Sequence, residues 1–335
     1  GLANTDELKQ KVYEAQGKYA DVGMCFDEIP IRIISGNTSA RLDTNNRYFD
    51  RENFESFARQ TGNNVLNQIL AFEKMGSKCR PFVIIQGNCL DTYYRWTEII
   101  MQTVPRELHE RIGGFALGSA ALGIGPLEDI KKAFYITQMP IEHNPVHLHI
   151  LGVGSVMRML PYLVFCQNGL YDNIEISYDS TTHSMSFDHG LFYKDYAQVK
   201  LGREFNELYR YAYDAINNLR PLSCSIEEFH HILSTNKERY LTEWPGATEK
   251  GYMEVRFGYF ANLVNRFCAD INSMATDKNN LLNFARGRGL ETDFASLYNV
   301  RSRQDFDRWL KDVGPHVSSM PVGDSAPGSL SDLFS

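Results

Sequence analysis

The first two thirds of the chain alternate between short apolar runs and longer stretches whose apolar residues recur at helical spacing. The apolar runs are Val22–Phe26, Phe82–Gln86, Phe115–Leu117, His147–Leu151 and Ile174–Tyr178. The stretches of helical spacing between them are Glu52–Phe72, Thr92–Met101, Leu127–Tyr135 and Met157–Gln167. Buried strands that alternate with helices in this way predict βαβ units and a parallel sheet.

Each predicted strand ends in a small or polar residue, which favours an α/β fold of the (β/α)8 TIM-barrel type, because all strand ends of a barrel meet at one functional face. A doubly wound sheet is the alternative, but it concentrates its glycines after the first strand. Five strands are clear, and a sixth is expected at Met185–Phe187 or Leu191–Tyr193. A barrel needs eight, and the sequence opens inside a predicted helix, so we expect one or two βα units to precede residue 1.

From Phe205 onward the pattern becomes helical. Helices are expected at Phe205–Leu219, Ile226–Leu233, Tyr252–Met274 and Phe306–Val313. We therefore divide the chain into a barrel (1–220), a mostly helical C-terminal region with a basic cluster (221–317), and a flexible tail rich in Ser, Gly and Pro (318–335).

The composition limits the class of protein. Of 335 residues, 43% are hydrophobic and 22% are charged, which provides a large core and excludes a disordered or fibrous chain. The net charge of -7 argues against coating nucleic acid by bulk charge, but allows an enzyme with a local basic patch. Six cysteines without a C-x-x-C pair, no signal peptide and no apolar run of membrane-spanning length predict a cytoplasmic protein with no membrane partner.

Two carboxylates, Asp27 and Asp179, each follow a predicted strand directly. At a barrel mouth a carboxylate can act as nucleophile, acid or base, metal ligand, or acceptor for a substrate N–H. The structural alternative is that each Asp caps the next helix or turn.

Three other strand ends carry candidates for binding a planar ligand. The Gln86 amide offers a donor and an acceptor to the edge of a heterocycle, or else makes a structural hydrogen bond to a loop. Gly118 and the pair Gly152 and Gly154 either let a flat ligand approach the backbone or form tight turns.

His147 and His149 point the same way from one predicted strand. This is the geometry of a metal-binding pair in some barrel hydrolases, but those sites need further ligands from later strands. We therefore assign no metal to the pair, and keep a metal-dependent hydrolase as an alternative.

The strongest basic cluster lies in the C-terminal region, where aromatic residues are interleaved with it, and it suits phosphate contacts together with packing on a base or sugar. The alternative is a solvated helix face that is balanced by nearby acids. The basic residues are Arg286, Arg288, Arg301, Arg303, Arg308 and Lys311. The aromatics are Phe284, Tyr298 and Trp309, and the acids are Glu291, Asp293, Asp305 and Asp307.

Five strand-end motifs occur in a fixed order along the chain. They are Phe26-Asp27-Glu28-x-Pro30, Ile85-Gln86-Gly87, Leu117-Gly118-Ser119-x-x-x-Gly123, Leu151-Gly152-Val153-Gly154 and Tyr178-Asp179. Over residues 6 to about 235, their order and spacing resemble the tRNA-guanine transglycosylase family. The chain is most similar to the DpdA-type DNA transglycosylases, which belong to phage and bacterial 7-deazaguanine systems.

The resemblance implies a pentosyltransferase that exchanges guanine in DNA for a free 7-deazaguanine base such as preQ0, in the cytoplasm (the host's, for a phage gene). It implies that Asp179 is the nucleophile that attacks C1′, and that Asp27 accepts hydrogen bonds from N1–H and the exocyclic amine of the purine. A carboxylate suits this step because it stabilises and traps an oxocarbenium-like sugar. The other substrate-binding residues implied are Gln86, Gly118, Ser119, Gly152, Val153 and Gly154. The nucleic-acid contacts we expect are Arg286, Arg288, Arg301 and Arg303.

The chain departs from the family in three places. The family has a further Asp, in an Asp-Ser-Gly-type motif on an earlier strand, and no such motif precedes Asp27. The family's structural zinc site has the pattern C-x-C-x-x-C and a distant His, whereas the corresponding region, Leu222–Glu227, holds one thiol, Cys224, so we expect no zinc and no cofactor. The loop after the nucleophile, Ser180–Ser184, lacks the Pro-Thr-Arg of the tRNA enzymes, which favours another polynucleotide.

Three alternatives remain. The same base exchange on tRNA is the nearest one, and a non-catalytic, nucleic-acid-binding relative of the family is the second. The third is the metal-dependent hydrolase that would use the two histidines. A homodimer is compatible with the resemblance, although the zinc region that helps to build family dimers has diverged.

Overall fold

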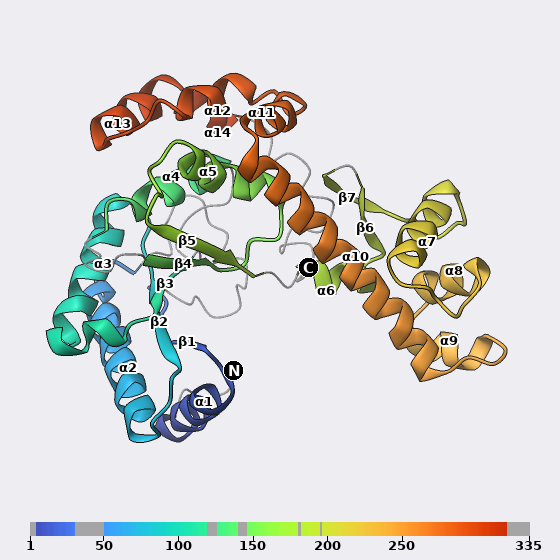
Figure 1. The fold of residues 1–335 in the computed structure, drawn as a ribbon, viewed down its shortest axis with the longest axis horizontal. Coiled ribbons are helices and arrows are strands. Elements are labelled where there is room, and N and C mark those ends of the chain that lie inside the picture. Colours follow the sequence, from blue (N-terminus) through green and yellow to red (C-terminus); the bar gives the residue numbers. More distant parts are fainter. Residues whose placement is uncertain are drawn as a thin grey trace.

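A five-stranded parallel sheet, in the order β1-β2-β3-β4-β5, forms the centre of the computed structural model (Figure 1). The structure describes residues 5–30, 50–118, 126–139, 146–179, 182–194 and 196–319. The strands are β1 (Val22–Met24), β2 (Arg80–Ile85), β3 (Gly114–Leu117), β4 (Val146–Ile150) and β5 (Ile174–Tyr178). The predicted parallel α/β sheet is therefore confirmed. The order of the described strands follows the chain without the reversal that a doubly wound sheet requires.

The helices of the N-terminal part form an arc around the outside of this sheet (Figure 1). They are α1 (Asp6–Tyr19), α2 (Phe54–Lys74), α3 (Leu90–Thr103), α4 (Pro126–Ile136) and α5 (Val156–Gln167), with a short 3-10 helix, η2 (Arg106–Arg111), after α3. The four helices expected between the strands are thus confirmed to within a few residues.

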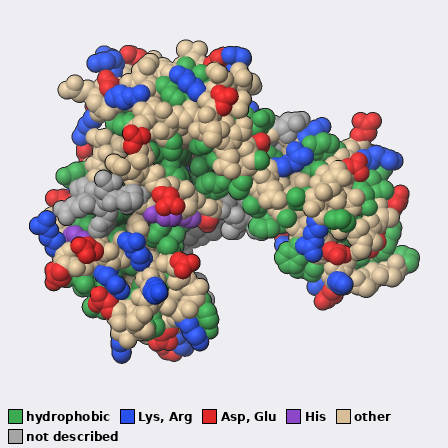
Figure 2. Space-filling model, viewed as in Figure 1, with side chains coloured by type: hydrophobic (Ala, Val, Ile, Leu, Met, Phe, Trp, Pro, Cys, Tyr) green, Lys and Arg blue, Asp and Glu red, His purple; other side chains and the backbone are tan. Residues whose placement is uncertain are grey.

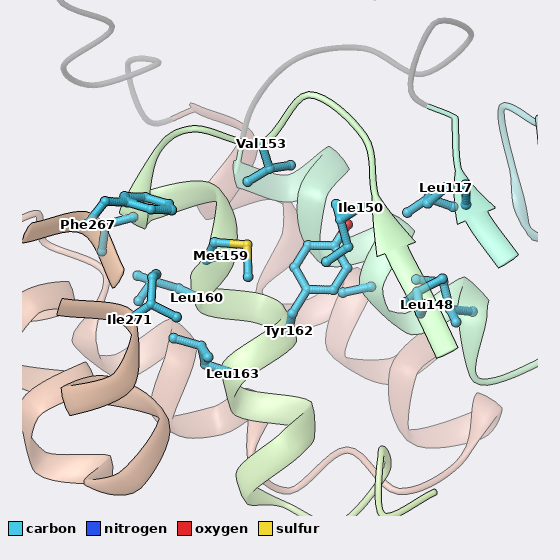
Figure 3. Close-up of a cluster of buried hydrophobic side chains, with 14 of the residues drawn as sticks. Leu117, Leu148, Ile150, Val153, Met159, Leu160, Tyr162, Leu163, Phe267 and Ile271 are labelled. Carbon is cyan, nitrogen blue, oxygen red and sulfur yellow. The ribbon is translucent and has the colours of Figure 1, made fainter. Parts of the chain in front are cut away.

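The sheet and the helices enclose a core of buried apolar side chains. Leu148 and Ile150 of β4 pack toward Tyr162 of α5, and Phe267 of α10 (Glu249–Thr276) lies on the other side of α5 (Figure 3). Alternate residues of a strand point to opposite faces, so His147 and His149 lie on the face of the sheet away from these helices. This alternation leaves polar side chains on the inner face of the sheet.

The C-terminal half is helical, apart from one antiparallel hairpin of β6 (Leu191–Lys194) and β7 (Ala197–Lys200). The hairpin and α7–α9 lie apart from the sheet, and α10 connects them to α11–α14 above α4 and α5 (Figure 1). On the face in Figure 2, the surface is indented between the part built on the sheet and the part that contains α7, α8 and α9. The remaining helices are α6 (Thr182–Asp188), α7 (Glu207–Leu219), α8 (Ile226–Ser234), α9 (Lys237–Glu243), α11 (Lys278–Arg286), α12 (Glu291–Leu297), α13 (Arg303–Asp312) and α14 (Gly314–Ser319).

Local sequence explains where most of these helices begin. A side chain that accepts a hydrogen bond from a first-turn amide satisfies one of the free donors of a helix start. Six helices of the C-terminal half have such a cap. The capping residues are Asn206, Ser225, Asn236, Thr248, Asp277 and Ser302.

Two expectations about the later part of the chain are corrected. Of the two sites for a sixth strand, Met185–Phe187 lies in α6, and Leu191–Tyr193 lies in β6, which pairs only with β7 among the described residues. The expected tail begins at Ser318, whereas α14 extends to Ser319, and residues 320–335 lie outside the described part. No helix in the described ranges is both long and apolar enough to cross a bilayer.

The docking of α13 on α4 generates the first prediction. Phe306 is buried, and its ring stacks on Phe134 with centroids 3.9 Å apart. Phe306→Ala should lower the free energy of unfolding by about 3–5 kcal/mol, because it leaves a cavity between the two helices. Urea unfolding measures this loss. Arg308→Ala, on the exposed side of α13, is the control and should stay within about 0.5 kcal/mol of the wild type. Equal urea midpoints for Phe306→Ala and the wild type would mean that α13 does not dock there.

Candidate functional site

The carboxyl ends of the strands carry two groups of polar side chains, one after β1 and β2 and the other after β4 and β5. The first group contains Asp27 and Gln86, and the Gln86 Nε2 donates a hydrogen bond to Asp27 Oδ2 at 2.7 Å. Gln86 is buried, and its Oε1 has no hydrogen-bond partner in the described part of the chain. The Gln86 amide thus makes a hydrogen bond within the protein. Its partner is Asp27, which was also expected to bind the purine base.

Burial raises the pKa of Asp27, and the hydrogen bond from Gln86 partly offsets this rise. A carboxylate has about four acceptor positions, and among the described residues Gln86 is the one side chain that donates to this carboxylate, so Asp27 keeps capacity to accept further N–H groups. Asp27 is therefore suited to accept from a donor pair such as the N1–H and amine of a guanine.

Gly118 lies against the Gln86 amide. A Cβ at position 118 would come within 2.5 Å of Gln86 Oε1, so only glycine leaves room for the amide to reach Asp27. The Gly118 carbonyl accepts a hydrogen bond from the buried Tyr93 hydroxyl at 3.2 Å. The glycine at position 118 is thus required by the Gln86 side chain, which belongs to the same group of polar residues. Ser119, expected beside it, lies outside the described residues.

The second group is centred on Asp179, directly after β5. Asp179 Oδ1 accepts a hydrogen bond from His149 Nε2 at 3.1 Å and another from the Gly152 amide at 3.0 Å. Oδ2 has no hydrogen-bond partner among the described residues, and the side chain is 55% exposed. One oxygen is therefore held in place while the side chain stays largely exposed, and this arrangement suits an oriented nucleophile or acceptor.

The register of the sheet brings His149 to Asp179. His149 pairs with Ser177 across β4 and β5, so its ring lies one residue pair before the strand end. Ser177 Oγ lies 2.9 Å from His149 Nδ1 and 2.7 Å from His147 Nε2. Glu175 Oε2 lies 3.7 Å from His147 Nδ1. Four polar side chains of the two strands thus form a continuous chain of contacts that ends at Asp179.

The other side of His147 is apolar. The ring of Phe82 meets it edge-on, with ring centroids 4.7 Å apart. Gly114 lies between them in the sheet and pairs with Phe82, and a Cβ there would collide with the His147 carbonyl. The apolar wall and the Ser177 hydroxyl together fix the orientation of the imidazole.

The loop after β4 is held from outside by a buried ion cluster. Arg158 of α5 contacts both carboxylate oxygens of Asp129 at 3.2–3.3 Å and donates to the Gly152 carbonyl at 3.1 Å. Lys132 Nζ lies 3.8 Å from Asp129, and burial lowers its pKa to about 8. Arg158 therefore holds the carbonyl of Gly152, the residue whose own amide donates to Asp179. Gly152 has a positive φ of 70°, which glycine adopts easily.

Val153 does not line a pocket, contrary to expectation. Its side chain is buried in the core toward α5, in the cluster drawn in Figure 3. Only the backbone of the segment can face a ligand, because Gly152 is exposed and Gly154 is partly exposed. The segment therefore presents its backbone at the two glycines, whereas the valine side chain belongs to the core.

The described residues include the two places where a metal was considered, the histidine pair and Cys224. They contain no group of three His, Cys, Asp or Glu side chains placed to hold a metal ion. His147 and His149 both contact Ser177, which occupies the space between the ring nitrogens of the pair. Cys224 is buried and burial raises its pKa to about 11, so it is a poor thiolate donor for zinc.

The four arginines expected to contact nucleic acid are divided among the ends of α11 and α13 and the turns beside them. Arg286 pairs with Glu291 at 2.6 Å, and Arg288 packs on the Phe284 ring at 3.7 Å. Arg303 lies 3.6 Å from Asp91, near the start of α3, and 4.0 Å from Asp307. Arg301 is exposed, and its guanidinium reaches the Val300 carbonyl at 3.4 Å.

These contacts leave the cluster partly neutralised, and Figure 2 shows basic and acidic side chains interspersed over this region. The interleaved aromatics Phe284, Tyr298 and Trp309 are buried, so none of them is exposed for stacking on a base. The contact with Asp91 places Arg303 beside the start of α3, the helix that follows β2 and Gln86.

Sequence reasoning missed Ser177, Arg158 and Asp129. The sequence could have predicted Ser177, because it lies two residues before Asp179 along a strand and its side chain therefore points to the same face of the sheet. Arg158 and Asp129 lie on different helices, and no spacing rule links them.

Fold and site together define an α/β protein with a polar site at the carboxyl ends of a parallel sheet, where such proteins bind ligands. No known family model matches the chain, and no curated protein sequence matches it either. The function therefore has to be argued from the site.

The contact between Gly118 and Gln86 generates the second prediction. Gly118→Ala should lower the free energy of unfolding by about 1–3 kcal/mol, because the methyl group displaces a buried amide. In a Gln86→Ala background the same substitution should cost much less, since the colliding amide is gone. Urea unfolding of the four proteins of this cycle measures the coupling. Equal losses in both backgrounds would refute the contact.

The raised pKa of Asp27 generates the third prediction. A carboxyl whose pKa is higher in the folded than in the unfolded state destabilises the fold as the pH rises through that pKa. Asp27→Asn removes this penalty, so the stability of the variant relative to the wild type should increase between pH 4 and pH 7. The increase is about 1.4 kcal/mol for each unit by which burial raises the pKa. Urea unfolding across this range tests it, with the exposed Asp21→Asn as control. A relative stability that does not change with pH would contradict the burial of Asp27.

Proposed function

We propose that the chain is a guanine transglycosylase that exchanges guanine in DNA for a free 7-deazaguanine base such as preQ0. We further propose that its sheet belongs to a (β/α)8 barrel, and that the reaction uses no metal and takes place in the cytoplasm. The observation that carries the proposal is Asp179: His149 and Gly152 hold its Oδ1, whereas its Oδ2 has no hydrogen-bond partner among the described residues and the side chain is exposed. The ordered strand-end motifs support it independently.

The reaction uses Asp179 as the nucleophile. Its free Oδ2 attacks C1′ of the deoxyguanosine, the C1′–N9 bond breaks, and the bonding electron pair leaves with guanine N9, which takes up a proton. A covalent sugar ester on Asp179 holds the DNA until the free 7-deazaguanine attacks C1′ in its turn. The incoming base loses its N9 proton, and the carboxylate is restored. Because the free base and not water attacks C1′, the base is exchanged and no abasic site is left.

Asp27 selects the base. Its carboxylate accepts from the N1–H and the exocyclic amine, which guanine and 7-deazaguanines share and adenine lacks. Gln86 fixes the Asp27 carboxylate through its Nε2, and its Oε1, which has no partner among the described residues, is left to accept from the other polar edge of the base. The same recognition serves both half-reactions, since the leaving and entering bases have this edge in common.

Barrel closure explains how Asp27 and Asp179 reach one nucleotide. They follow the first and fifth strands of the described sheet, which lie four strand spacings, or about 19 Å, apart in a flat sheet. In a ring of eight strands, the first and fifth positions face each other across the barrel. The carboxylates then point toward each other from opposite walls, one at the base and the other at the sugar. The target nucleotide has to leave the stack to enter this space.

The choice of DNA over tRNA rests on the sequence of the loop after Asp179 and on the missing zinc ligands. Of that loop, Ser180 and Thr181 lie outside the described residues. Arg303 is the arginine best placed to contact a phosphate beside the site.

The fourth prediction is base exchange by the full-length protein. Labelled preQ0 is offered with duplex DNA in one reaction and with unmodified tRNA in another. Label should enter DNA, and Asp179→Asn should lower the rate by about 1000-fold or more because the nucleophile is gone. Asp172→Asn, an exposed carboxylate just before β5, is the matched control and should retain activity. Label in tRNA alone would contradict the choice of DNA, and label in neither would contradict base exchange.

A further inference from the structure

We propose that His147, Ser177 and His149 form a proton relay, which moves one positive charge between the Glu175 end and the Asp179 end of the inner face of the sheet. The three are positioning residues that act on Asp179. Their use in catalysis rests on the proposed function, whereas the relay itself does not.

The contacts allow hydrogen bonds along the whole chain. His149 Nε2 lies 3.1 Å from Asp179 Oδ1, and an ionised carboxylate only accepts, so this nitrogen carries a proton. Ser177 Oγ has one proton to donate and lies between His149 Nδ1 at 2.9 Å and His147 Nε2 at 2.7 Å. It therefore donates to one ring and accepts from the other.

With one extra proton on the relay, two arrangements satisfy every contact. In the first, His147 is the imidazolium, its Nε2–H donates to Ser177, and Ser177 donates to the bare Nδ1 of His149. In the second, His149 is the imidazolium, its Nδ1–H donates to Ser177, and Ser177 donates to the bare Nε2 of His147. Two short proton transfers interconvert them: the Nε2 proton of His147 moves to Ser177, and the Ser177 proton moves to His149. No proton is gained or lost.

The groups around the two rings give each arrangement a different partner. His147 faces Glu175 at 3.7 Å and the edge of the Phe82 ring, and His149 faces Asp179. Ala116 of β3 pairs with His149 and brings no charge. Among the described residues, the charge of the relay is thus attracted by Glu175 at one end and by Asp179 at the other.

The charge of Asp179 determines which of the two histidines is the imidazolium. As a carboxylate 3.1 Å from His149, Asp179 favours the imidazolium on His149, because the attraction between opposite charges is strongest at short distance. When Asp179 becomes a sugar ester its negative charge disappears, and Glu175 draws the imidazolium to His147. The imidazolium thus lies beside Asp179 while Asp179 is a free carboxylate, and moves to His147 while Asp179 is an ester. When the second half-reaction restores the carboxylate, the imidazolium moves back to His149.

The test is the ring protonation of His147, read by nitrogen-15 NMR of the full chain with labelled histidine. Asp179→Asn removes the anion as esterification does, and should shift the His147 ring nitrogens toward imidazolium values, although the two side chains do not touch. Ser177→Ala should abolish this effect on His147, while Ser177→Thr, which restores the hydroxyl, should recover it. An unchanged His147 spectrum in Asp179→Asn overturns the relay. An effect that persists in Ser177→Ala overturns it as well.

The same variants separate this inference from the proposed function. In the exchange assay, Ser177→Ala should lower kcat by about tenfold and leave the KM for the free base unchanged, and Ser177→Thr should recover kcat. Coupling by NMR in a protein that exchanges no base would leave the relay standing and the proposed function refuted. Base exchange in a protein that shows no coupling by NMR would support the proposed function and refute the relay.

Discussion

Side-chain alternation along β4 and β5 is the constraint on which the site depends. Leu148 and Ile150 are buried toward the helices, so their neighbours His147 and His149 are obliged to face the other way. A shift of one residue in register would place both histidines in the apolar core. The packing that stabilises the sheet therefore also positions the polar groups that contact Asp179.

Groups that the site uses are held at some cost to the fold. Asp27 is a partly buried carboxyl with a raised pKa, and Lys132 is a buried amine with a lowered one. Burial disfavours the charged form of each of these two groups. The hydrogen bond from Gln86 and the ion cluster of Asp129 with Arg158 offset these costs. Stability is thus exchanged for a fixed arrangement of carboxylates and loop, as is common at functional sites.

Much of the fold could be predicted because it depends on local patterns. Apolar runs and helical spacing predicted all five strands of the parallel sheet. The positions of Asp27 and Asp179 directly after strands predicted that both lie at the carboxyl end of the sheet. Asp27 and Gln86 were expected to bind the same base, whereas the hydrogen bond between them came from the structure. What a pattern cannot provide is the partner of a side chain.

The expectations that went wrong were of this kind. Val153 lies in a loop that reaches the site, yet its side chain turns into the core. The aromatics beside the basic cluster are buried by packing between helices, which no spacing rule predicts. Arg286 pairs with Glu291, one of the nearby acids that the alternative named. Strand β6 has a strand-like sequence but pairs with its neighbour in a hairpin, since β propensity does not choose the partner strand.

The central claim is that Asp179 forms a covalent bond to the sugar of its nucleic-acid substrate. The most direct measurement is mass spectrometry of the protein after incubation with duplex DNA without free base, denaturation, and digestion of DNA and protein. The account predicts a deoxyribose-linked adduct on the peptide that contains Asp179, which disappears when preQ0 is added before denaturation. An adduct on a different residue, or base exchange that proceeds in Asp179→Asn, would contradict it.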